Sequence, residues 1–340
     1  MTAMARSPSR HLAALFASVL LCVTGACDED KPASAASSPT PIMTEGSSAQ
    51  WPGESVTQRL RGMSGDELDG DGGPSAEWYF PVFEAGVLAS AGEVDFHNRY
   101  ASTVMVAADT PLIDEACSGV LLTPRVVLTA AHCVCMQRRA LSAEGREELL
   151  SDSSTCTLRA TITAVSYEPT GDRLNPTKRF RHHEGWVQPH PQFRLLLDDQ
   201  ASILASSANL AVIILDQPLE VPSPPIALAE TAVQPNEYLF MAGYGGDRHI
   251  GSIHGVRYFR RNKVTGSSTP MREHVPYEQE GAYVYNGFSG GPCFRENGKG
   301  HSLVGIASMG SPKELFFTSI SFHGAWLRAE LQRAARKDRP

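Results

Sequence analysis

Two short motifs in this sequence carry the residue types that acyl transfer through a serine requires. Residues 128–133 read Leu-Thr-Ala-Ala-His-Cys, and residues 287–292 read Gly-Phe-Ser-Gly-Gly-Pro. Such chemistry needs a hydroxyl, a base that takes its proton, and backbone N–H groups aimed at the oxyanion. Ser289 can supply the hydroxyl and His132 the base, while the glycines around Ser289 allow a tight turn with exposed N–H groups. The two motifs therefore predict nucleophilic chemistry at Ser289.

The length and composition are those of a globular chain. The 340 residues suffice for one large domain or two small ones, and 42% are hydrophobic, which can fill a core. The formal net charge is −7 and no long basic block occurs, so we expect no nucleic acid partner. Seven cysteines, together with an apolar leader, fit an oxidising compartment.

Residues 1–26 have the pattern of a signal peptide for export. Arg6 and Arg10 precede an apolar run over 12–23, which is too short to span a bilayer comfortably. The run ends in Val-Thr-Gly-Ala-Cys, which resembles the bacterial lipobox and would make Cys27 a lipidated first residue, although Thr stands where Leu is usual. A lipid there would anchor the protein to a membrane. The alternative is ordinary cleavage nearby, so we expect either the bacterial cell envelope or secretion.

Residues 27–92 are predicted to form a flexible tether. The segment is rich in Pro, Ala, Ser, Thr, Gly and Asp, so burial of apolar surface cannot offset the entropy of ordering it. Its last part, 76–92, is richer in aromatic residues, and the sequence leaves open whether it packs on the domain or orders on docking. The folded domain is expected over 93–340.

Short β-strand patterns fill the rest of the chain. Runs of β-branched and apolar residues, separated by turns, lie at 102–107, 118–122, 125–130, 160–165, 210–215, 238–243, 256–259 and 302–307. Many short strands predict barrels or a sandwich. Over residues 324–337 the apolar side chains recur near helical spacing, so we predict a C-terminal α-helix.

The two motifs and several other segments, all in the same order, resemble the chymotrypsin/trypsin family of serine proteases over about residues 100–332. The other segments are a His-Pro-x-aromatic turn at 190–193, a Gly-Tyr-Gly turn at 243–245, a strand at 304–310, and a final strand and helix at 317–327. The resemblance implies an all-β fold of two antiparallel six-stranded β-barrels with a C-terminal α-helix, and a site between the barrels.

The resemblance also implies a role for individual residues. Ser289 would be the nucleophile and His132 the general base, and the N–H groups of Gly287 and Ser289 would form the oxyanion hole. Cys117 and Cys133 would pair as a disulfide behind the histidine.

Three residues would contact substrate by the same resemblance. Ser308 and Gly310 would line the substrate cleft. Tyr283 falls where the family has the floor of its specificity pocket, and an uncharged aromatic ring there argues against a preference for Arg or Lys.

One departure concerns the residue that orients the histidine. The family has aspartate before Ile/Leu-Ala-Leu/Val, whereas this chain has Asn209. The carboxylate normally accepts the histidine Nδ1–H, and an amide that donates there favours the wrong tautomer; this Asp-to-Asn change lowers turnover of a relative about 10⁴-fold. Asp198 and Asp199, in the preceding loop, are alternative supports for His132. Asp216 is worse placed, because an extended strand separates it from Asn209.

A second departure is Phe288, directly before Ser289. Family members that are activated by cleavage have an aspartate there, which pairs with the new N-terminus, and phenylalanine carries no charge. We therefore predict a domain that needs no proteolytic activation, with Phe288 packed in the core.

Three further cysteines of the folded domain, at 135, 156 and 293, can form only one disulfide among themselves. Cys135 and Cys156 bracket an insertion and are expected to pair, which leaves Cys293 as a buried thiol. The alternative is a bond from Cys293 to one of these two.

The other histidines lack metal-ligand spacing. His182 and His183 are adjacent, with Glu184 and His190 nearby, and neighbouring side chains on a strand point apart. We predict a solvated loop there, no metal and no cofactor.

The sequence therefore predicts an exported serine endopeptidase that cleaves protein or peptide substrates through an acyl-enzyme. The alternative is a protease-like binding module on the cell surface that has lost turnover. Asn209 favours the module. A pure scaffold has no need of His132 and the whole serine turn, and their presence favours the enzyme.

Overall fold

The computed structural model describes the chain from residue 92 to residue 337, with gaps. The described ranges are 92–110, 117–142, 145–170, 176–198, 202–222, 226–247, 255–266, 273–279, 284–286, 288–297, 300–308 and 315–337. All of them lie in the larger of two compact units, Gly53–Pro340. The predicted signal peptide, the predicted lipidation site at Cys27 and the tether as far as residue 91 lie outside the described residues.

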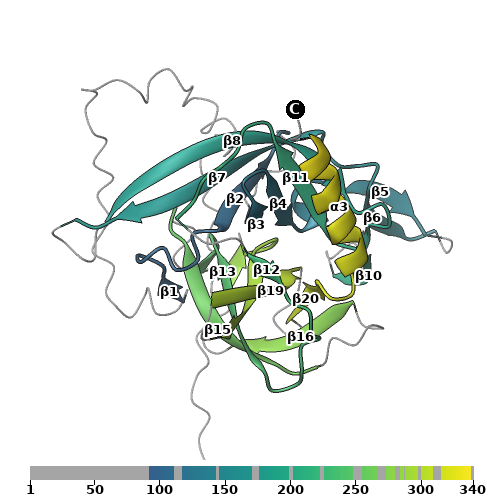
Figure 1. Ribbon diagram of the computed structural model, residues 1–340. Helices are drawn as coiled ribbons and strands as arrows, with labels where there is room; N and C mark the ends of the chain where they lie inside the picture. Colours follow the sequence, from purple (N-terminus) through teal and green to yellow (C-terminus); the bar gives the residue numbers. More distant parts are fainter. Residues whose placement is uncertain are drawn as a thin grey trace, which may run out of the picture. The chain divides into compact units, whose positions relative to one another are not determined.

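A closed antiparallel β-barrel is built from the earlier strands (Figure 1). Around the ring the order is β11-β4-β3-β2-β7-β8, and β8 pairs with β11 to close it. The strands are β2 (Thr103–Ala108), β3 (Cys117–Thr123), β4 (Val126–Thr129), β7 (Arg159–Glu168), β8 (Thr177–Pro189) and β11 (Ala211–Leu215). β4 is buried at every residue and reads Val-Val-Leu-Thr, because β-branched and apolar side chains suit a strand in a closed core.

A second closed antiparallel barrel follows in the chain. Its ring order is β15-β13-β18-β19-β20-β16, and pairing of β15 with β16 closes it. The strands are β13 (Tyr238–Gly243), β15 (Tyr258–Val264), β16 (His274–Gln279), β18 (Pro292–Asn297), β19 (Gly300–Ala307) and β20 (Leu315–Ser319). Shorter strands join it: β1 (Glu93–Val94) pairs with β15, and β12 (Ala227–Leu228) pairs in parallel with β19. A separate two-stranded pair is formed by β14 (Gly246–Asp247) and β17 (Val284–Asn286).

In the described part of the chain, a small sheet of four strands forms no β-ladder with either ring, although its β9 side chains pack in the main core. Its order is β10-β9-β6-β5, with β5 (Arg138–Leu141), β6 (Glu147–Asp152), β9 (Arg194–Leu197) and β10 (Ile203–Ser207). The Cys135–Cys156 disulfide bridges the segment that holds β5 and β6. β10 ends two residues before Asn209, so this sheet leads the chain directly to a predicted site residue.

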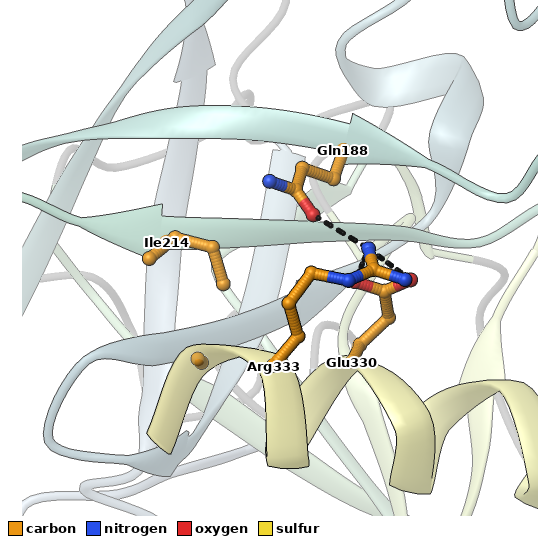
Figure 2. Close-up of a pocket in the computed structure, with 5 residues that line it drawn as sticks. Gln188, Ile214, Glu330 and Arg333 are labelled. Carbon is orange, nitrogen blue, oxygen red and sulfur yellow. Dashed lines mark hydrogen bonds and ion pairs between the residues drawn. The ribbon is translucent and has the colours of Figure 1, made fainter. Parts of the chain in front are cut away.

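The helix α3 (Gly324–Lys337) ends the described chain and packs on the first barrel. Leu327 is fully buried on that side. Figure 2 shows the shallow pocket between α3 and the barrel, where Arg333 donates to Glu330 at 2.7 Å and to Gln188 of β8 at 3.3 Å. The guanidinium thus bridges helix and strand.

These elements confirm the predicted fold class of two antiparallel six-stranded barrels and a C-terminal helix. One local prediction is wrong: His182 and His183 lie inside β8 and not in a loop. They pair with Thr163 and Ile162, because β7 and β8 form one long hairpin that runs beyond the ring. Within the described residues, no helix is both long and apolar enough to cross a membrane.

Candidate active site

His132 lies in a short 3₁₀ turn, η1 (Ala131–Cys133), at the end of β4. Ala131 is fully buried, so only a small side chain fits behind the turn. A disulfide joins Cys133 to Cys117 at the start of β3. The histidine is therefore fixed by tight main-chain packing and by one covalent cross-link to the barrel.

Asn209 is fully buried and contacts His132 with both ends of its amide. Its Oδ1 accepts the backbone N–H of His132 at 3.0 Å, and its Nδ2 lies 2.9 Å from His132 Nδ1. Nδ2 also donates to Ser308 Oγ at 2.9 Å. These contacts bring together three residues that the sequence placed in the site.

The backbone N–H fixes the orientation of the Asn209 amide. A backbone N–H can only donate, so the amide oxygen must face it. Nδ2 then has one N–H for Ser308 and a second for His132 Nδ1, at 2.9 Å against 3.2 Å for Oδ1. A ring nitrogen that accepts this N–H has no proton of its own. The geometry favours the tautomer with the proton on Nε2.

Burial sets the charge of the imidazole. Desolvation lowers the pKa of His132 to about 4, and the hydrogen bond with Asn209 raises it by less. Asn209 brings no negative charge that would stabilise an imidazolium ion. His132 is therefore neutral at physiological pH.

Ser289 lies in the turn before β18, and this turn rests on the first barrel. The Ser289 carbonyl accepts the backbone N–H of Ser118 in β3 at 2.8 Å. Gly290 has φ +79°, and a Cβ there would lie 2.2 Å from Thr129 Oγ1 and 2.3 Å from the Ser118 carbonyl. Only glycine fits this conformation and this space. Because Thr129 is three residues before His132, the serine and histidine motifs meet where the barrels join.

Within the described residues, no hydrogen bond links Ser289 Oγ to His132, and His132 Nε2 lies 3.8 Å from Cys133 Sγ. Catalytic hydrogen bonds are often long before substrate binds. Three predicted residues lie outside the described residues: Gly287, Tyr283 and Gly310.

Phe288 packs in a small apolar cluster with Val94, Val256 and Tyr258. Its ring is half-buried, and it closes against Gly243, where a Cβ would lie 3.0 Å from Phe288 Cγ. Apolar residues thus contact the buried side of Phe288, at the position where the family's cleavage-activated members carry a charge.

The carboxylates considered as substitutes make other contacts. Asp198 accepts the backbone N–H of Ser202 at 2.7 Å. Asp216 pairs with Arg159, at 3.1 Å for one oxygen. Asp199 lies outside the described residues.

Among the described residues, the cysteines offer no metal site. Cys135 pairs with Cys156, and Cys293 is a buried thiol whose pKa burial raises well above the ordinary value. Cys117, His132 and Cys133 lie close enough together to share an ion. Both of these cysteines are tied up in a disulfide, so neither offers the thiolate that a metal would need.

Sequence reasoning missed the groups that hold Asn209 itself. Glu273 accepts the backbone N–H of Ala208 and faces His323. No local motif marks Glu273, which lies 65 residues from Ala208 in sequence. Only the folded chain brings these groups together.

Comparisons with known proteins were made for the whole chain. The family model described as Trypsin matches residues 92–321, which include both barrels and the motifs of His132 and Ser289. A search of curated protein sequences finds no match. Among solved structures, the scabies mite inactivated protease paralogue S-I1 matches with a TM-score of 0.49 and 17% identity, over 72% of this chain and 99% of that chain.

Proposed function

The chain belongs to the trypsin family, and we propose that it is a serine endopeptidase whose turnover Asn209 limits. Ser289 is the nucleophile, His132 the base, and the N–H groups of Gly287 and Ser289 the oxyanion hole. One observation supports this most directly. The Ser289 carbonyl accepts the N–H of Ser118 in β3, and β3 is paired with β4, the strand that leads into the His132 turn.

The reaction proceeds through an acyl-enzyme. Ser289 Oγ attacks the scissile carbonyl as its proton passes to His132 Nε2, and the oxyanion is held by backbone N–H groups. The C–N bond then breaks and His132 returns the proton to the leaving amine. Water, deprotonated by His132, attacks the ester; the bond to Ser289 Oγ breaks, and His132 returns the proton to Oγ as the acid leaves. Each half of this cycle needs His132 Nε2 to be unprotonated at its start.

Asn209 opposes that requirement. While Asn209 Nδ2 donates to His132 Nδ1, the proton sits on Nε2 and cannot be exchanged for that of Ser289. Catalysis then uses only the minor tautomer, in which His132 Nδ1–H donates to Oδ1 across 3.2 Å. Because Nδ2 and Oδ1 of Asn209 compete for His132 Nδ1, and the closer Nδ2 favours the inactive tautomer, we infer slow turnover.

A trypsin-like domain acts on proteins or peptides, which bind as extended strands. We propose that Ser308 and Gly310 line this cleft and that Tyr283 forms the pocket floor, which disfavours Arg and Lys beside the scissile bond. The contact between Ser308 Oγ and Asn209 supports a cleft next to the histidine.

The second candidate is a binding module that keeps the cleft and has lost turnover. The orientation of the Asn209 amide favours it, because the resting tautomer cannot activate Ser289. Such a module holds an extended peptide in the same cleft without cleaving it. Both candidates require the fold described above, and turnover alone separates them.

The two disulfides fit an oxidising compartment outside the cytoplasm. We propose that the chain is exported and that a lipid on Cys27 anchors it to the bacterial cell envelope through the tether. No sequence motif suggests a cofactor, and the reaction requires none.

Ser289→Ala is expected to abolish hydrolysis of casein and of a panel of peptide esters by the full-length protein. Ser289 Oγ is the atom that forms the acyl bond, so activity should fall to the background rate. Ser302→Ala removes a hydroxyl from β19 away from the site and serves as the control. Equal activity of Ser289→Ala and the parent would refute the proposed nucleophile. No activity in any variant would favour the binding module.

The acid limb of the pH–rate profile is expected near pH 4. Only neutral His132 can take the serine proton, and burial lowers its pKa to about 4. kcat/KM should therefore stay level as pH falls from 7 to 5 and decline below that. A limb near pH 6.5, the ordinary histidine value, would show a solvated base. Folding is checked at each pH by circular dichroism.

A further inference from the structure

The backbone next to Asn209 adopts a strained conformation. Ala208 is buried and has φ +48°, a left-handed conformation that costs a residue with a Cβ about 1–2 kcal/mol. The N–H of Leu210 donates back to the Ala208 carbonyl at 2.7 Å, so Asn209 lies at the centre of a three-residue turn. Something outside the turn must hold it in this shape.

Two groups hold the turn, one at each end. At its far end, the Leu210 carbonyl accepts the N–H of His190 at 2.8 Å. At its near end, Glu273 Oε1 accepts the N–H of Ala208 in a short hydrogen bond. The first contact lies within the first barrel. The second crosses from the second barrel, because Glu273 directly precedes β16.

Glu273 is itself fixed from two sides. Its Oε1 lies 3.1 Å from His323 Nε2, at the start of α3, and its carbonyl accepts the N–H of Ser319 at 2.8 Å. The ring of His323 meets that of His190 at 4.9 Å between centroids, and Trp326 covers His190 at 4.6 Å. The carboxylate thus has little freedom to leave Ala208.

The charge of Glu273 fits this role. Burial raises its pKa, but the hydrogen bond from His323, the nearby imidazoles of His274 and His323 and the hydrogen bond from the N–H of Ala208 outweigh burial, and its pKa lies below the ordinary value. An ionised carboxylate is the stronger acceptor for a backbone N–H.

We propose that Glu273, held by His323, is a positioning residue that fixes Asn209 against His132 by pinning the N–H of Ala208. Without this acceptor, the Ala208 N–H would be buried and unpaired, and the turn would relax to a right-handed conformation. Asn209 would then lose its register with the His132 backbone N–H and with Nδ1. The effect on turnover rests on the proposed function; the effect on the imidazole does not.

The test reads the His132 imidazole by ¹⁵N NMR of the full-length protein, with its signals assigned by their loss in His132→Gln. In the parent, one tautomer predominates and the two ring nitrogens have well separated shifts. Glu273→Leu is expected to bring these shifts together, as tautomers mix. Glu273→Gln keeps an acceptor oxygen and should retain the separation.

Glu237→Leu is the matched control. Glu237 is also a partly buried glutamate of the second barrel, paired with Arg295 at 3.0 Å, and it does not contact the turn. Its loss should leave the His132 shifts unchanged. The proposal is overturned if Glu273→Leu leaves the shifts separated, or if Glu237→Leu merges them as well. Should Glu273→Leu fail to fold, Glu273→Asp decides: the shorter carboxylate should merge the shifts in part, and unchanged shifts would overturn the proposal.

A kinetic test compares the double variant Asn209→Asp, Glu273→Leu with the single variant Asn209→Asp. There, Glu273→Leu is expected to lower kcat about 10- to 100-fold with KM within about twofold, since a misplaced base affects the chemical step. A rise in KM with constant kcat would show that Glu273 acts on substrate binding and would overturn the proposal. If Asn209→Asp itself has no turnover, the proposed function fails, while the NMR result still decides the role of Glu273.

Discussion

Asn209→Asp is expected to raise kcat about 10³- to 10⁴-fold, the largest gain that any single substitution in this chain should give. A carboxylate accepts His132 Nδ1–H, keeps Nε2 free for the proton of Ser289 and stabilises the imidazolium that forms. The gain corresponds to about 4–5.5 kcal/mol of transition-state stabilisation. KM should change little, because Asn209 is buried behind His132. Peptide-ester kinetics measure both constants.

Asn209→Asp should also move the acid limb of the pH–rate profile to higher pH. The pKa of His132 is about 4 beside a neutral amide, and a buried carboxylate at hydrogen-bond distance raises it. Asn262→Asp is the control, since it introduces a carboxylate at a buried amide in β15, away from the site. If Asn209→Asp changes neither kcat nor the limb while the parent is active, another carboxylate, such as that of Asp199, supports His132.

Arg257→Met is expected to lower the free energy of unfolding by about 3–5 kcal/mol. Arg257 is fully buried and donates to Asp95 at 2.8 Å, to the Val165 carbonyl at 2.9 Å and to the Tyr244 hydroxyl at 2.9 Å. These partners come from the segment after β1, from β7 of the first barrel and from the residue after β13. Removal of the cation leaves a buried carboxylate without its counter-charge, which is the costly way to break such a pair.

Urea unfolding with intact disulfides measures this cost, read from the midpoint at constant slope. Asp95→Asn in the Arg257→Met background should recover part of the loss, because the amide has no charge to bury. Its single oxygen still accepts one of the two N–H groups, those of Arg99 and Tyr100, that the two carboxylate oxygens accept separately. Arg139→Met breaks an exposed pair with Glu147 and should cost less than about 1 kcal/mol. A cost below 1 kcal/mol for Arg257→Met would contradict the buried-pair account.

Local sequence patterns predicted those strands and helices whose periodicity is visible within a single segment. The strand predicted at 238–243 and the helix predicted at 324–337 have these bounds in the structure, since strand and helix periodicity is visible within one segment. The four-stranded sheet was not predicted. β10 reads Ile-Leu-Ala-Ser-Ser, without clean alternation, and the sheet exists because β6 pairs with β9 far along the chain.

The site divides in the same way. The motifs located His132, Asn209 and Ser308, and the structure brings these three into contact. Glu273 was missed, as was Arg257 outside the site, because charged residues are expected at the surface and their burial depends on partners that no local window contains. Phe288 was predicted in part. The absence of a charge before Ser289 was visible in the sequence. Its apolar neighbours were not, because Val94 precedes the first barrel in the sequence and Val256 and Tyr258 follow it.

The contact of α3 with β8 and β11 has a consequence for the order in which the protein is made. Synthesis proceeds from the N-terminus at about 5–20 residues per second, so the roughly 120 residues between Leu215 and Arg333 take about 6–24 s. During that interval the first barrel lacks both its covering helix and the glutamate–histidine pair that holds the turn at Asn209. The ribosome therefore delivers His132 early in synthesis and the groups that orient Asn209 last.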